Sequence, residues 1–293
     1  MGMAEKGAGM KLRLAITALV LGNRHDAHFA AVGDWLEANL PCRFLADASA
    51  TAAEACGDVE PAVVILLHSR PGQFMETEIA ALRRRWPLAR FVAVFASWCE
   101  GEPRSGRVLG GVYRVPWHVA RERLAAELST FVGSDRSATY AGLFELPPTA
   151  TADERLLANS YPVAARPVAV AVAAIRSSVA EPLVVALAAA GHSAVYWPLA
   201  DAALVRGIDA VVWDTFGCDT RLARLRDCLP TVRGDGPVIA LADFPRPQDV
   251  ARLVELGVDR VLGKPLLVAD LLTCLDEFAA PVASIPDRSS AVA

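Results

Sequence analysis

The feature that most constrains this chain is an alternation of short apolar runs with amphipathic stretches. In the second half, the apolar runs lie at 168–174, 193–197, 210–213, 237–241 and 260–262. Short apolar runs of this length are typical of strands that are buried on both faces of a parallel sheet. The second half therefore predicts five βα units in roughly 115 residues, wound right-handed into a three-layer α/β/α sandwich.

The stretches between these runs carry helix-end signals. Ser178 and Glu181 have the spacing of a capping box, and Gly191 and Gly257 fit the position just after a helix, where a positive φ is favoured. We expect helices at 178–190, 201–206, 219–229, 248–256 and 266–278.

The first half repeats this order. Strands are expected at 12–20, 43–45, 62–67, 91–95 and 112–115. Helices are expected between and after them, at 28–38, 52–55, 74–85 and 119–131. A repeat of roughly 150 residues indicates a duplicated domain rather than a solenoid. The predicted fold class is thus α/β, with two tandem sandwiches that each contain a parallel five-stranded sheet.

Composition shifts set the expected domain boundaries. Two α/β domains are expected at 11–133 and 167–279, after a flexible N-terminus at 1–10 and before a disordered tail at 280–293. The segment 134–166, which contains two adjacent prolines, is expected to be a linker that packs on one domain. Within it, Thr151 and Glu154 have capping-box spacing, which predicts a short helix at 150–157.

Charge and cysteine usage narrow the function classes. A net charge of −4 and a pI of about 5.8 exclude a broadly basic nucleic-acid binder. Six cysteines without C-x-x-C spacing predict reduced thiols and a cytoplasmic protein. The apolar run at 14–21 is interpreted as a first strand rather than a signal peptide, and no run reaches the roughly 18 residues of a membrane helix. No glycine-rich phosphate loop is present, so no cofactor is expected.

The strand ends of the second half carry the first candidate site. Asp214 ends a predicted strand, Ala242 and Asp243 end the next, and Lys264-Pro265 follow the last. The chain has 26 arginines but three lysines, and the other two lysines lie near the N-terminus. A compact ammonium can reach a buried carboxylate where a planar guanidinium does not fit, although chance retention on a surface loop is the alternative.

This arrangement resembles the receiver domain of bacterial response regulators, a CheY-like, flavodoxin-like fold, over about 166–278. The residues that carry the resemblance are Asp214, at the end of V-V-W-D, and the Lys264-Pro265 pair. The resemblance implies that Asp214 stands where a receiver accepts its phosphoryl group and that Lys264 pairs with it. It also implies that the first half is a more diverged copy.

The sequence departs from the receiver pattern at two points. Receivers bind Mg²⁺ through an acidic pair after the first strand, but no carboxylate occurs between Pro167 and Glu181. Ala242 replaces the family's hydroxyl residue at the switch position, and Asp243 either adds a second acid or faces solvent. We therefore expect a degenerate receiver without the usual Mg²⁺-dependent phosphorylation. Asp214 and Lys264 would form a standing ion pair. This pair would either lie in a functional pocket or have a purely structural role.

The strand ends of the first half carry a different set of residues. The neighbouring fourth and fifth strands lead into S-W-C-E-G-E and R-V-P-W-H, which would share one rim with the end of the third strand. The candidate site comprises His68, Ser97, Trp98, Cys99, Glu100, Glu102, Arg114, Trp117 and His118.

Three interpretations of this rim stay open. A Cys–His nucleophile needs hydrogen-bond reach and a lowered thiol pKa. A metal site could use Cys99, His118 and either His68 or Glu100, although the spacing is not diagnostic and no metal is assigned. The third interpretation is a binding surface for a partner or for the other domain.

We therefore expect a non-enzymatic regulatory or scaffold protein of bacterial two-component signal transduction. It would act through protein–protein contacts with a signalling partner or with a second copy of itself, and not with nucleic acid or membranes. No helix-turn-helix pattern follows Phe278. The alternatives are a metal-binding protein or enzyme centred on Cys99, Glu100 and His118, and a small-molecule sensor at the strand-end crevice.

Overall fold

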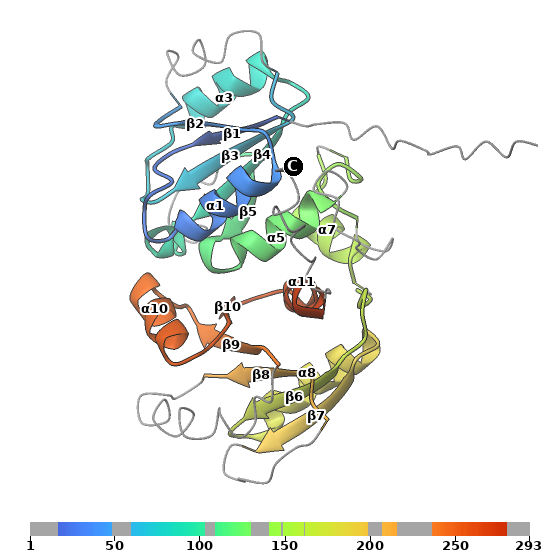
Figure 1. The fold of residues 1–293 in the computed structure, drawn as a ribbon. Helices are drawn as coiled ribbons and strands as arrows, with labels where there is room; N and C mark the ends of the chain where they lie inside the picture. Colours follow the sequence, from blue (N-terminus) through green and yellow to red (C-terminus); the bar gives the residue numbers. More distant parts are fainter. Residues whose placement is uncertain are drawn as a thin grey trace, which may run out of the picture. The chain divides into compact units, whose positions relative to one another are not determined.

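The computed structural model describes residues 17–48, 60–102, 109–129, 141–147, 149–160, 162–198, 207–215 and 236–279. They fall into two compact units (Figure 1). The first unit comprises Met1–Arg114 and Leu128–Ser134, and the second comprises Val115–Glu127 and Asp135–Ala293. Each unit is built on a five-stranded parallel sheet with interleaved helices, which confirms the predicted fold class.

The first sheet has the strand order β2-β1-β3-β4-β5. Its strands are β1 (Ala18–Leu21), β2 (Cys42–Leu45), β3 (Val63–His68), β4 (Arg90–Phe95) and β5 (Tyr113–Pro116). The helices that follow these strands in the first unit include α1 (Ala30–Asn39), α3 (Glu76–Arg85) and the 3-10 turn η1 (Ser97–Cys99). Four of the five strands lie within one residue of their predicted bounds. For the strand expected at 12–20, β1 covers Ala18–Leu21, and residues 12–16 lie outside the described residues.

The second sheet has the order β10-β9-β8-β6-β7. Its strands are β6 (Ala169–Ala174), β7 (Ser193–Pro198), β8 (Ala210–Asp214), β9 (Val238–Asp243) and β10 (Arg260–Lys264), and its helices include α8 (Ser177–Ala189), α10 (Pro247–Glu255) and α11 (Val268–Ala279). Numbered from its own first strand, this sheet has the order 2-1-3-4-5, which is also the order of the first sheet. That order is the flavodoxin-like one.

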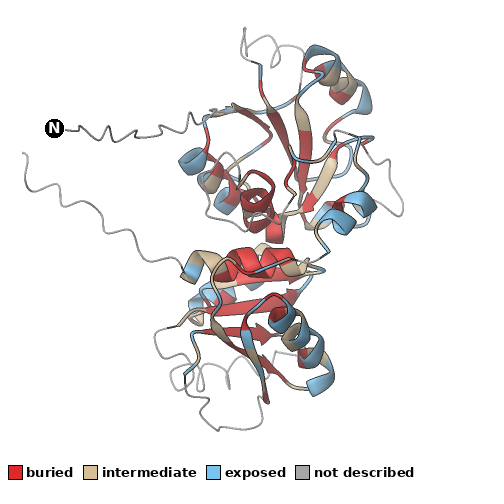
Figure 2. Ribbon diagram, turned by 90° about the vertical axis from the view of Figure 1, so that its right-hand side faces the viewer, coloured by how far each residue is buried: buried red, intermediate tan, exposed pale blue. Residues whose placement is uncertain are grey.

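Burial explains why the strands read as apolar runs. Every residue of β3 and β8 is buried, because helices cover both faces of each sheet (Figure 2). Residues such as Leu66 and Phe91 form an apolar cluster in the first unit, and Trp213 and Leu253 belong to one in the second.

The helix α5 (Ala120–Glu127), with the preceding 3-10 turn η2 (Trp117–Val119), belongs to the second unit. Its Arg123 guanidinium donates two hydrogen bonds of 2.6 Å to the carboxylate of Asp270 on α11, and both residues are buried. Glu122 and Glu127 on the same helix are also buried. Residues 115–127 are thus grouped with the second unit, whereas the sequence analysis expected them in the first domain, at 11–133. The expected domain boundaries stay a prediction.

The helix-end signals were partly right. The short helix α7 (Ala152–Ala158) has the expected capping box, in which Glu154 N donates to Thr151 Oγ1 and Thr151 N donates to Glu154 Oε2. Gly191 and Gly257 have positive φ, as predicted. The Ser178 capping box is wrong, because α8 already begins at Ser177 and its N-cap, Arg176, makes no side-chain cap bond.

Several expected segments lie outside the described residues: the helices at 52–55, 201–206 and 219–229, and the two termini. None of the helices in the described part of the chain combines the length and the apolar character needed to cross a bilayer.

Candidate functional sites

The predicted lysine–aspartate pair is formed at the carboxyl edge of the second sheet. Asp214, Asp243 and Lys264 are the last residues of β8, β9 and β10, which are neighbours in the sheet. Lys264 Nζ lies 2.6 Å from Asp214 Oδ1 and 2.8 Å from Asp243 Oδ1. One ammonium therefore joins two carboxylates, and the peptide bond from Lys264 to Pro265 is cis.

The surroundings of this pair hold it together. Asp214 is 2% exposed, so its carboxylate depends on Lys264 for charge compensation. Burial lowers the pKa of Lys264, but the hydrogen bonds and charges of Asp214 and Asp243 together raise it above the ordinary value. The sequence analysis expected Asp243 either to add a second acid to the site or to face solvent. The structure shows both features, because the residue is solvent-exposed and its carboxylate also binds Lys264.

The strand end where a receiver carries its acidic pair has no carboxylate here. In the sheet β6 lies beside β8, and Ala173 pairs with Trp213, one residue before Asp214. The chain continues from β6 through Ile175 and Arg176 into α8. At the switch position, Ala242 is buried and pairs with Gly263 of β10. The site thus holds a lysine and two acids, and it has neither the acidic pair nor the hydroxyl that a receiver would carry at these positions.

A second cluster lies at the carboxyl edge of the first sheet. His68 ends the third strand of that sheet, as Asp214 does in the other, while Cys99 closes η1 after β4 and Glu102 follows it. One ligand-type atom from each of these three residues lies within 4.8 Å of the other two, and all three residues are buried.

Short polar contacts hold the cluster. His68 Nε2 lies 3.6 Å from Glu102 Oε1, and Arg114 on β5 donates to the other oxygen, Glu102 Oε2, at 3.2 Å. Arg114 also donates to the carbonyl of Cys99 at 3.4 Å, and the Cys99 thiol donates to the carbonyl of His68 at 3.5 Å. Arg114 therefore fixes both the carboxylate and the turn that carries the thiol.

The protonation states argue against a Cys–His nucleophile. Burial raises the pKa of the Cys99 thiol to about 12. Burial also lowers the pKa of His68 below its ordinary value, although the carboxylate of Glu102 acts in the opposite direction. At neutral pH the thiol is protonated and the imidazole neutral, whereas a nucleophilic cysteine needs a lowered thiol pKa.

Other predicted members of the first-half rim are not among the three residues of this cluster. Ser97 Oγ is 3.2 Å from His28 Nε2, and Trp98 is 76% exposed. His118, adjacent to Trp117 in η2, belongs to the second unit, where its buried ring packs directly on Gly263. The carboxylate in the cluster is Glu102 rather than Glu100, which the sequence had offered as a ligand. The three-residue spacing of Cys99 and Glu102, which suits one helical turn, was the available signal.

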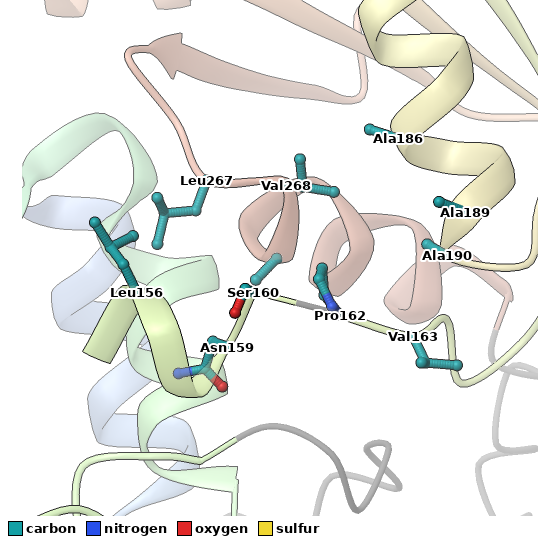
Figure 3. A pocket seen from close by; sticks show the side chains of 11 residues that line it. Leu156, Asn159, Ser160, Pro162, Val163, Ala186, Ala189, Ala190, Leu267 and Val268 are labelled. Carbon is teal, nitrogen blue, oxygen red and sulfur yellow. The ribbon is translucent and has the colours of Figure 1, made fainter. Parts of the chain in front are cut away.

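A hollow of about 310 Å³ lies in the second unit between α7, α8 and the start of α11 (Figure 3). Its lining is largely apolar and includes Leu156, Pro162, Val163, Leu267 and Val268. None of the lining residues belongs to the Asp214–Lys264 site. The small-molecule sensor at the strand-end crevice stays a prediction.

Comparison with known proteins gives distant likenesses. No protein-family model and no curated protein matches this sequence. A solved structure described as a probable two-component system response regulator/GGDEF domain protein matches at 12% identity and a TM-score of 0.34, covering 90% of this chain and 98% of the other. The E. coli RcsC C-terminus, with its linker region and phosphoreceiver domain, matches at 14% identity and a TM-score of 0.29, covering 92% of this chain and 94% of that one. The structure of D-2-hydroxyisocaproate dehydrogenase matches at 9% identity and a TM-score of 0.25, covering 90% of this chain and 94% of the other. We therefore base the fold on the strand order and not on these neighbours.

Proposed function

We propose that this chain is a regulatory protein of signal transduction whose second unit is a degenerate receiver domain. The observation that carries the proposal is the pair formed by Lys264 and Asp214 at the carboxyl edge of a flavodoxin-like sheet, without an acidic partner after β6. In this proposal, the domain acts by binding proteins and does not transfer phosphoryl groups.

The charges at the site support this view. Phosphoryl transfer to a carboxylate requires that the negative charge of the phosphate be neutralised, usually by Mg²⁺. Mg²⁺ takes near-octahedral oxygen ligands at about 2.0–2.1 Å, and in such sites it relies on carboxylates. Here Asp214 and Asp243 both already bind the ammonium of Lys264. An incoming metal ion would have to compete with that ammonium for the same two oxygens.

The first unit supports the same conclusion from a different residue set. The third strand of the first sheet ends in His68 where the second sheet has Asp214, and the fifth strand of the first sheet ends in Pro116 where the second sheet has Lys264. Neither a phosphoryl acceptor nor a pairing ammonium is present at these strand ends. Because neither receiver-like unit would transfer phosphoryl groups in this proposal, the proposed activity is contact with other proteins or with a second copy of the chain.

The experiment is a phosphorylation assay on the full chain. Protein is incubated with Mg²⁺ and acetyl phosphate, and its intact mass is measured at neutral pH, with a conventional receiver as positive control. We expect no added phosphoryl group. An added phosphoryl group that is present in the wild type and absent from Asp214→Asn would overturn the proposal.

A further inference from the structure

We propose that His68, Cys99 and Glu102 form a binding site for a soft divalent metal ion of the zinc class. The ligand atoms would be His68 Nε2, Cys99 Sγ and Glu102 Oε1. This proposal concerns the first unit and does not depend on the assignment of the second unit as a degenerate receiver.

The geometry is close to that of a tetrahedral site. With Zn–N and Zn–O bonds of about 2.0–2.1 Å and a Zn–S bond of about 2.3 Å, tetrahedral ligand atoms stand roughly 3.3–3.6 Å apart. Here His68 Nε2 and Glu102 Oε1 are 3.6 Å apart, and all three ligand atoms lie within 4.8 Å of one another. A shift of about 1 Å in the thiol position would complete the geometry, which leaves a fourth position for water or another ligand.

The imidazole of His68 supplies a second, independent observation. The residue is 2% exposed, and its Nε2 lies 3.6 Å from Glu102 Oε1. The backbone of Arg70 also interacts with the ring and raises its pKa, but within the described part of the chain neither ring nitrogen has a partner at full hydrogen-bond geometry. Buried polar atoms in native proteins are almost always hydrogen-bonded, because leaving them without a partner is unfavourable. A metal ion on Nε2 would satisfy one of these two atoms.

Arg114 has the contacts of a positioning residue for this site. It binds Glu102 Oε2 and so leaves Oε1 turned toward His68. Such outer-sphere partners orient metal ligands and raise affinity. The binding step balances in atoms and electrons: as the metal–sulfur bond forms, the Cys99 S–H bond breaks and its proton passes to solvent, with no change of oxidation state. The metal, thiolate, carboxylate and guanidinium then sum to a single positive charge.

Cobalt(II) is the direct probe, because a thiolate ligand gives an intense charge-transfer absorption that oxygen and nitrogen ligands do not. Metal-stripped full chain is titrated with Co²⁺ under a non-thiol reductant, and Zn²⁺ is then added in competition. We expect one Co²⁺ per chain, a thiolate band, release of about one proton per metal at pH 7, and displacement by Zn²⁺.

Variants separate this site from the other cysteines. Cys99→Ser and His68→Gln should lose the thiolate band or the binding, while Cys42→Ser, a partly buried cysteine of the same unit, should keep both. Arg114→Gln should bind about 10–100-fold more weakly. Circular dichroism verifies folding of each variant. Absence of the band in the wild type, or its persistence in Cys99→Ser, would refute the site, and neither result bears on phosphorylation of Asp214.

Discussion

Replacing Lys264 by methionine tests how much the Asp214 pair contributes to the second unit. The substitution keeps the length of the side chain but leaves the carboxylate of Asp214, whose side chain is 3% exposed, without its 2.6 Å partner. Removing one member of a fully buried pair costs about 3–5 kcal/mol, and an exposed pair is worth about 0.2–1 kcal/mol. The Lys264 side chain is 26% exposed, so we expect an intermediate loss, about 2–3 kcal/mol.

The assay is urea unfolding of the full chain at pH 7, followed by the fluorescence of buried tryptophans such as Trp213. With a slope of about 2 kcal/mol per molar urea, the loss lowers the midpoint of the transition by roughly 1–1.5 M. The raised pKa of Lys264 means that its contribution is complete below pH 10.5 and is lost as the pH rises through the folded-state pKa, so pH 7 measures it in full.

A double-mutant cycle supplies the control. Asp214→Asn removes the carboxylate that Lys264→Met leaves unpaired, so the double variant should be more stable than Lys264→Met alone, with a coupling energy of about 1–2 kcal/mol. A Lys264→Met midpoint within error of the wild type, or strictly additive effects in the cycle, would refute the reasoning.

Three other changes test the second unit in the same unfolding assay. Arg123→Leu should cost about 3–5 kcal/mol because it strands the buried Asp270, while the double variant Arg123→Leu/Asp270→Leu should recover most of that loss; equal losses would contradict the pair's role. Burial raises the pKa of Glu122 to about 7, so wild-type stability should fall as pH rises from about 4.5 to 7, and Glu122→Gln should flatten that slope. An unchanged slope would count against this account. Gly263→Ala places a Cβ closer to the His118 ring than van der Waals contact allows and should cost about 1–3 kcal/mol, which His118→Ala in the same chain should partly restore.

Much of the fold could be predicted from the sequence, because strands buried on both faces are apolar throughout. The ends of β3, β4 and β8 were placed within one residue or two for this reason. The strand-end positions of Asp214 and Lys264 followed from the same argument, since carboxyl ends of parallel strands share one edge.

The helix α5 could not be assigned in this way. Its charged residues suggest a solvent-facing surface, yet Glu122, Arg123 and Glu127 are buried. The partner that compensates Arg123 is Asp270, 147 residues further along the chain. No local pattern encodes a contact over that distance, so the grouping of α5 with the second unit had no signal in the sequence.

The members of the first-unit cluster were predicted too broadly for a related reason. Adjacent strand ends brought His68, Cys99 and Arg114 into one set, but the sequence could not say which acid points inward. Glu102 binds Arg114, and that contact depends on the position of β5 beside β4.

The most direct test of the account is the ionisation of Lys264 itself. The chain has three lysines, so nitrogen-15 NMR of the side-chain ammonium groups should give three signals, which Lys6→Arg and Lys11→Arg would assign. We predict that Lys264 titrates above the ordinary value of 10.5, because two carboxylates stabilise its charged form. A Lys264 pKa below 10.5 would mean that burial outweighs the two carboxylates, and it would contradict the standing ion pair on which the proposed degenerate receiver rests.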